Sequence, residues 1–261
     1  MSRWYLILFL LVLHVGPRFA LGQNPPPSDP QALTYAAQSI ATMTGGSTIS
    51  DVTLTGNVTW TAGSATETGT ATLLALGSGE SRVNLVLSDG THTEIRDAST
   101  GTTQGQWIAP DGSSGLFAAQ NCWTDAVWFF PALGSLTVGP NIVLSYIGQE
   151  TRNGQSVQHV QSYVYQSSQS PAPSPQQLSM IDFYLDATTL LPTAVTFNAH
   201  PDNNAGSNIA IEIDFSQYQA FNGATVPMHI QKYVQGTLVI DLTISSVAFN
   251  SGLQLSTFTI N

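Results

Sequence analysis

The sequence predicts an α+β protein built on one strongly curved antiparallel sheet, an unclosed half-barrel of about ten strands. Two observations predict it. Apolar residues recur at helical spacing only near the N-terminus and in one mid-chain segment, whereas from Ile49 onward the apolar period is two. Because the helical segments do not alternate with strands, a parallel βαβ sheet is disfavoured. We expect an N-terminal helix and a short mid-chain helical insertion to cover the sheet.

Residues 1–22 are typical of an export signal. A short basic start precedes an apolar run over residues 4–15, and the small residues Ala20 and Gly22 follow it. The run is shorter than the roughly 20 residues that span a bilayer, so we expect cleavage near Gly22 and no stable membrane insertion. The mature protein is then exported, to the periplasm or the extracellular space.

The mature chain is expected to begin with a flexible proline-rich lead, residues 23–29, followed by a single domain over residues 30–261. Asp29 is placed to cap a helix that has Pro30 at its first position, and Gly45 and Gly46 end it. The apolar positions of this helix follow the helical repeat: Leu33, Ala36, Ala37, Ile40 and Met43.

Strands are predicted where apolar and polar residues alternate. In the first strand, Val52, Leu54, Val58 and Trp60 share one face, and threonines occupy the other. The same alternation recurs in residues 83–87, 142–146, 181–185, 209–215 and 238–244. Residues 167–177, rich in serine and proline, are predicted to form a disordered loop.

Charged residues make up only 8% of the chain. Cleavage of the signal removes Arg3 and Arg18, which leaves four basic residues against 16 acidic ones and a net charge of −12. Binding to nucleic acid or to anionic lipid head groups requires clustered Lys and Arg, so the composition argues against both.

The segment 121–136 contains the single cysteine, Cys122, and a dense group of aromatic residues. Thr124 is placed to cap a short helix from Asp125, and Pro131 must kink that helix or start another turn. Consecutive aromatic residues point around a helix, so the segment is either a core plug or a lid over a ligand. The ligand-binding candidates are Trp123, Trp128, Phe129 and Phe130, together with Trp60 of the first strand and Met43 of the helix.

No motif for catalysis, metal binding or cofactor binding stands out. Cys122 could act as a nucleophile with His159, His200 or His229 as base, but no local signature surrounds it. The carboxylate pairs in residues 182–186 and 212–214 fit the solvated face of a strand. His200 is expected in a turn at a strand end. The sequence therefore predicts a protein that is not an enzyme and takes no cofactor.

The chain resembles the LolA/LolB lipoprotein-carrier superfamily, which includes LppX/LprG proteins and the RseB sensor domain. The resemblance rests on the N-terminal helix leading into "ISDVTLTGNV", on the turn "DATTLLP" at residues 186–192, and on "NGATVP" at residues 222–227. It implies an open half-barrel covered by helices, with an apolar hollow that holds acyl chains.

Two functions remain open at this point. One is binding or carrying a lipid, an acylated molecule or another apolar ligand in the hollow. The other is a non-catalytic sensor or interaction module with a filled core, whose exposed strand edge binds an envelope protein. The space left beneath residues 121–136 distinguishes them.

Overall fold

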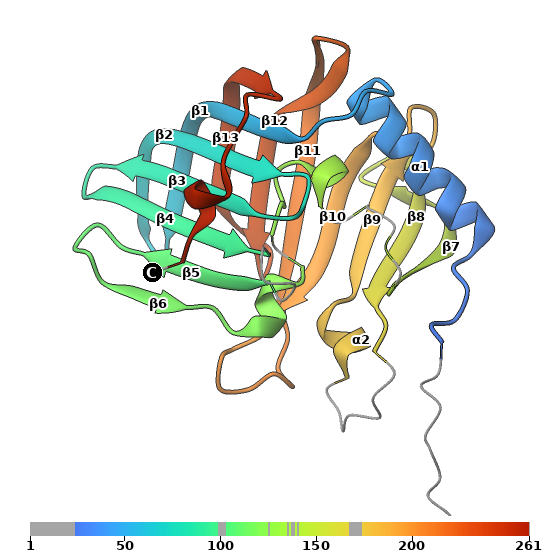
Figure 1. Cartoon of the computed structure of the whole chain (residues 1–261), viewed down its shortest axis with the longest axis horizontal. Helices are drawn as coiled ribbons and strands as arrows, with labels where there is room; N and C mark the ends of the chain where they lie inside the picture. The colour runs from blue at the N-terminus through green and yellow to red at the C-terminus, as the bar shows by residue number, and fades with distance from the viewer. Residues whose placement is uncertain are drawn as a thin grey trace, which may run out of the picture.

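The computed structural model describes residues 24–98, 103–124, 126–134, 136, 139, 141–166 and 174–260. Within these ranges, thirteen antiparallel strands form one sheet in the order β6-β5-β4-β3-β2-β1-β13-β12-β11-β10-β9-β8-β7. The sheet is open, because β6 and β7 remain as edges, and it is strongly curved (Figure 1). The predicted fold class, a curved and unclosed antiparallel sheet, is confirmed. The predicted signal, residues 1–22, lies outside the described ranges.

The strands follow one another along the chain as a meander, except that the first strand pairs with the last. Their bounds are β1 Asp51–Ala62, β2 Ala65–Leu76, β3 Ser81–Leu87, β4 Gly90–Asp97, β5 Gln104–Ile108, β6 Ser114–Leu116, β7 Ile142–Arg152, β8 Gln155–Val164, β9 Ile181–Asp186, β10 Pro192–Ala199, β11 Ile209–Phe221, β12 Ala224–Val234 and β13 Thr237–Phe249.

The structure has more strands than the ten that we expected, and β5 and β6 account for part of the difference. In β5, polar residues and a glycine replace regular aliphatic alternation, and β6 is only three residues long. β5 pairs with β4 and β6 pairs with β5, and this places both strands in the sheet, because backbone hydrogen bonds form whether or not the side chains are aliphatic.

Alternation divides the sheet into a concave apolar face and a convex polar face. On the concave face, Val58 of β1 lies opposite Leu242 of β13, which in turn lies opposite Ile230 of β12. All three side chains are buried. The same phase continues through β9 to β11, where Phe183, Val195 and Ile213 occupy one row. The core is therefore the inner surface of the bent sheet together with what covers it.

Helix α1, Pro30–Thr44, is one of these covers and forms as predicted. The Asp29 carboxylate accepts hydrogen bonds from the first turn, and Gly45 ends the helix in the left-handed conformation. The helix lies against β7, β8 and β12. Its end fits closely against the β11–β12 turn, because a Cβ atom on Gly45 would come within 1.9 Å of the Gly223 carbonyl oxygen.

Residues just before α1 are attached to the edge of the sheet. The backbone N–H of Asp29 donates to the Leu144 carbonyl, and the Leu144 N–H donates to the Ser28 hydroxyl. These bonds use part of the free edge of β7.

Helix α2, Pro175–Leu178, corrects part of the loop that we predicted over residues 167–177. Ser174 and Gln177 form a reciprocal capping box, and Pro175 occupies the first helical position, so four residues are sufficient for one turn. Residues 167–173 lie outside the described ranges.

The mid-chain insertion covers the hollow and is helical only in short turns. The helix that we expected from Asp125 does not form over residues 126–130, and Asp125 itself lies outside the described ranges. The insertion contains two short 3₁₀ turns, η1 Ala119–Cys122 and η2 Pro131–Leu133, joined by irregular backbone. The Thr124 hydroxyl makes no capping hydrogen bond and is buried. We call the described part of residues 123–136 the roof segment. It packs in the same core as both halves of the sheet and lies between them in Figure 1. Apolar packing, more than helix formation, determines its course.

The C-terminal residues return to the start of β1. The Asp51 carboxylate accepts hydrogen bonds from the backbone of Ser251 and Gly252 and from the Ser251 hydroxyl. Burial alone would raise the pKa of Asp51, but these hydrogen bonds outweigh burial and lower it. The chain then ends in the 3₁₀ turn η3, Leu255–Phe258, against β3 and β4. No helix in the described ranges is long and apolar enough to cross a bilayer.

Candidate ligand-binding site

The roof segment inserts its aromatic side chains into the concave face. Phe129 and Phe130 are fully buried and Trp128 is 4% exposed. The rings of Trp128 and Phe129 meet edge to face, with their centres 5.7 Å apart. The centre of the Phe130 ring lies 5.9 Å from that of Phe249 in β13. These three residues therefore fill much of the hollow from above.

The predicted site residues fall into three groups. Trp60 and Trp128 line one cavity beside the roof segment, and Trp123 lines another. Phe129, Phe130 and Met43 belong to the packed core between them and line neither of these two cavities. The structure thus brings Trp60 and Trp128 together and places Trp123 apart from them.

The cavity beside Trp60 and Trp128 measures about 150 Å³. Its third indole belongs to Trp107 of β5, which sequence analysis did not identify. Gly115 of β6 makes room for that ring, since a Cβ atom there would approach Trp107 to 2.8 Å. The complete lining is Trp60, Val83, Leu85, His92, Thr93, Glu94, Trp107, Ile108, Ala109, Trp128, Lys232 and Ile240. It is an apolar pocket with a few polar groups, the composition typical of small-molecule sites.

Lys232 gives this cavity a positive charge on an otherwise aliphatic row. It lies on the concave face because β12 pairs it with Ile240, which pairs with Trp60. Its side chain is 8% exposed and its ammonium lies over the Trp128 ring. The sequence carried a clue that we did not use, because Lys232 follows Ile230 in the apolar phase of the strand.

A second cavity, of about 220 Å³, lies on the other side of the roof segment. Its walls come from the roof segment, from β7 to β9 and from residues beside β2 to β5. The complete lining is Ser78, Gly79, Ala98, Thr103, Cys122, Trp123, Thr124, Ala126, Val127, Gly134, Ile142, Ser162, Tyr163, Val164, Ser179 and Ile181. Both cavities are smaller than the roughly 300–1,000 Å³ of most ligand sites, so the hollow is mostly closed in this conformation.

Cys122 is buried beside the second cavity. Its thiol donates a weak hydrogen bond to the Ala118 carbonyl at 3.7 Å. This arrangement fits a small buried side chain. The described residues contain no group of His, Cys, Asp and Glu that could hold a metal ion.

The paired carboxylates lie on the convex face, on the opposite side of the sheet from the hollow. Asp182 accepts hydrogen bonds from His159 and Gln161, and Glu212 pairs with Arg152. Burial, and then the neighbouring Glu212, raise the pKa of Asp214 to about 6. Asp182 and Glu212 are therefore engaged by neighbouring side chains on the surface of the sheet.

Comparisons of the sequence with models of known families and with curated proteins give no match. Solved structures do share the fold. A domain from Vibrio parahaemolyticus, provisionally described as an outer membrane lipoprotein-sorting protein, superposes with a TM-score of 0.58 at 15% identity, covering 87% of this chain and 96% of that one. A LolA superfamily protein from Nitrosomonas europaea gives 0.56 at 10% identity, covering 88% and 97%.

A DUF1329 family protein from Desulfovibrio piger gives a TM-score of 0.57 at 10% identity, covering 90% of this chain and 98% of that one. At such low sequence identities, the similarity between these structures and this chain is a similarity of fold alone. The chain has the open half-barrel fold of the LolA superfamily, as the resemblance in sequence implied. Its coverage of these structures is nearly complete.

Proposed function

We propose that this chain is an exported, non-catalytic protein that binds an apolar or acylated molecule on the concave face, beneath the roof segment. One observation carries the proposal. The apolar hollow is covered by two short 3₁₀ turns and irregular backbone, with an unfilled cavity on each side of them. A short cover of this kind can move without breaking a helix or a sheet ladder.

The ligand and the roof aromatics compete for the same surface. Burying a 16-carbon chain yields on the order of 12 kcal/mol gross, at about 0.8 kcal/mol per methylene. Moving a buried aromatic or large aliphatic side chain into water costs about 1.5–3 kcal/mol each. Displacing Trp128, Phe129 and Phe130 therefore consumes a substantial part of the gain. Binding remains reversible, as a protein that takes up and releases its ligand requires.

The direct test uses mature protein and a dansyl-labelled fatty acid. Excitation of tryptophan should produce dansyl emission, because Trp60, Trp107 and Trp128 surround one cavity. Trp128→Phe should reduce the energy transfer more than the matched change Trp123→Phe does. Lipid extraction and mass spectrometry of freshly purified protein should yield a bound amphiphile. A flat titration together with an empty extract would refute the proposal.

A second candidate is a sensor or interaction module with a filled core. It is favoured by the complete burial of Phe129, Phe130 and Met43, and by the edge strand β7, where Ile147 is 53% exposed. An edge strand can accept an extended segment of a partner protein. This function predicts the flat titration described above, and a partner whose binding protects β7 amides from hydrogen exchange.

A further inference from the structure

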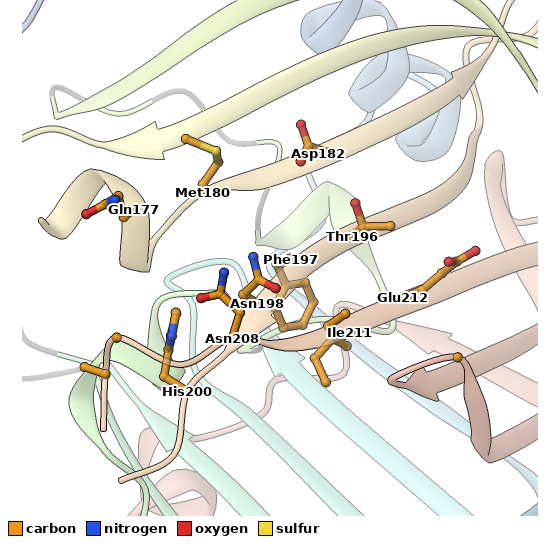
Figure 2. Close-up of a pocket in the computed structure, with 14 residues that line it drawn as sticks. Gln177, Met180, Asp182, Thr196, Phe197, Asn198, His200, Asn208, Ile211 and Glu212 are labelled. Atoms are coloured by element: carbon orange, nitrogen blue, oxygen red, sulfur yellow. The ribbon is translucent and has the colours of Figure 1, made fainter. Parts of the chain in front are cut away.

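A cavity of about 550 Å³ lies on the convex face, across the sheet from the roof segment (Figure 2). Its volume falls within the range of about 300–1,000 Å³ that is usual for ligand sites. Outward-facing residues of β9 to β11 form most of its base, Phe197 and Ile211 of the buried core also reach it, and α2 and the 200–208 loop border it. The lining is Gln177, Met180, Asp182, Thr196, Phe197, Asn198, His200, Ala205, Gly206, Asn208, Ala210, Ile211, Glu212 and Gly236.

The strand register places the polar residues of this site on the face opposite the hollow. Thr196 of β10 lies opposite Asp182 of β9 and opposite Glu212 of β11, so the three side chains form one row. They alternate with the buried residues Val195 and Ile213 of the concave face. In Figure 2 the row rises from adjacent strands toward the same side.

His200 lines this cavity and carries an acceptor without a partner. The residue is 4% exposed, and Asn121 fixes its backbone through two hydrogen bonds of 2.8 Å. Its Nδ1 lies 2.9 Å from the Ser207 carbonyl, which can only accept, so the proton resides on Nδ1. Nε2 is then a lone-pair acceptor, buried and without a partner. Buried polar atoms are almost always hydrogen-bonded, so this one marks a place where a donor is missing, and a small rotation of the ring would bring it to a ligand in the cavity.

Three amide side chains add donors and acceptors. Asn198 and Asn208 form no side-chain hydrogen bond with the described residues, although both line the cavity. The Gln177 carbonyl oxygen accepts from Ser174, which leaves its NH2 group directed to other partners. Amides serve both as donors and as acceptors, the pattern that matches hydroxyl groups.

The charges argue against an anionic ligand. No Lys or Arg lines the cavity, and its two carboxylates are engaged by His159 and Arg152. The remaining oxygens of Asp182 and Glu212 can accept from hydroxyl donors. Met180, Ala205 and Ala210 provide apolar surface for the face of a ring. From these features we propose that the cavity binds a neutral, hydroxyl-rich molecule, namely a saccharide of one or two rings.

The test titrates the mature protein with maltose, cellobiose and N,N'-diacetylchitobiose, followed by nitrogen-detected NMR of the His200 imidazole. At least one saccharide should shift the Nε2 resonance saturably, as a new hydrogen bond to that atom requires. Asn198→Ala and Asn208→Ala should each weaken binding by about 2- to 10-fold, the value of a neutral hydrogen bond. Asn203→Ala is the matched control, since Asn203 is exposed in the same loop but does not line the cavity.

Several results would overturn the proposal. One is that none of the three saccharides shifts the His200 Nε2 resonance. Another is that Asn203→Ala weakens binding as much as Asn198→Ala and Asn208→Ala do. A third is saturable binding of ethanolamine in their place, which would indicate a site for cations. Ala210→Trp, a change at an exposed position, should abolish the shift while the dansyl fatty acid titration stays as in the unmodified protein. The proposal of a saccharide site and the proposal of an apolar ligand in the hollow can thus be refuted independently.

Discussion

The ammonium nitrogen of Lys232 lies 4.9 Å from the centre of the Trp128 ring. The only lysine of the chain thus contacts the roof segment from the concave face of the sheet. A cation over an indole is worth about 0.5–2 kcal/mol, the upper value applying where water is excluded. This contact is one of those that hold the roof segment down.

Lys232→Met should loosen the roof segment while retaining most of the apolar stem. We expect hydrogen exchange at the amides of Phe130 and Leu133 to accelerate by about 2- to 30-fold, which corresponds to the loss of that contact. Both amides are bonded only within the segment, to the carbonyls of Val127 and Phe130. Lys232→Arg keeps the cation and should exchange nearly as slowly as the unmodified protein. Equal acceleration in both variants would contradict this role.

Phe130→Ala should destabilise the protein by about 3–5 kcal/mol, because it removes a fully buried ring and leaves a void beside Phe249. Urea unfolding of the mature protein measures the change. Val86→Ala is the control, since Val86 is 49% exposed and its truncation should cost less than about 0.5 kcal/mol. A small effect at Phe130 would mean that the ring does not contribute to the core in solution.

Gly45→Ala and Gly46→Ala separate steric contact from backbone strain. Both glycines have positive φ, so alanine at either position costs about 1 kcal/mol of unfolding free energy. Only at Gly45 would the new methyl group meet another atom, the Gly223 carbonyl oxygen, while Gly46 has open space. We expect Gly45→Ala to cost about 3 kcal/mol in urea unfolding. Equal losses in the two variants would show that α1 does not dock closely on the β11–β12 turn.

Gly105→Cys should form a disulfide with Cys122 under mild oxidation. A Cβ atom at position 105 lies 2.9 Å from the Cys122 Sγ, close to the separation between a Cβ and the far sulfur in a disulfide with an S–S bond of about 2.05 Å. The side chains of Phe117 and Arg96 must shift slightly to admit it. Thiol titration before and after oxidation measures the yield.

The same variant tests opening of the hollow. The oxidised form ties Cys122, the residue just before the roof segment, to β5, so the dansyl fatty acid should bind more slowly, and dithiothreitol should restore the rate. Unchanged kinetics in the oxidised form would indicate that the ligand enters elsewhere.

Asp214→Asn should change how stability depends on pH. The pKa of Asp214 is raised from 3.8 to about 6, mainly by burial and then by Glu212, while Arg152 opposes the shift. A raised carboxyl pKa stabilises the folded state at low pH, and this contribution is lost as pH rises from about 4 through 6. The variant should thus be more stable than the unmodified protein at pH 7 by about 1 kcal/mol, a value reduced because the site is half-exposed. The difference should vanish near pH 4 in urea titrations.

Regular elements could be predicted because their signals are local. Asp29 and Pro30 mark the start of α1, and alternation in β1 and β13 places their apolar residues on one face. The roof segment could not be predicted in the same way. A turn begins at Pro131, as one of our alternatives had it, but residues 126–130 are not helical, because contacts with the distant concave face determine where Trp128 and Phe130 lie.

Which residues line the tryptophan cavity and the convex-face cavity depends on how the strands pair, and a single sequence does not reveal that pairing. Trp107 joins Trp60 only because β5 and β6 pair as they do, and Lys232 reaches Trp128 across the hollow. The unpartnered nitrogen of His200 follows from its bond to Ser207 and from burial. Sequence analysis placed His200 at a strand end, which is correct, but nothing in the sequence indicated the cavity that it lines.

The pairing of β1 with β13 has a consequence for biogenesis. Val52 and Phe249 are neighbours in the sheet although they lie far apart in the sequence, so they can meet only after residue 249 has been synthesised. Closing so long a loop is slow, so the strand pair at the centre of the sheet should form late in folding. Until it forms, the facing edges of β1 and β13 remain free to pair with other chains, so refolding yield should fall as protein concentration rises.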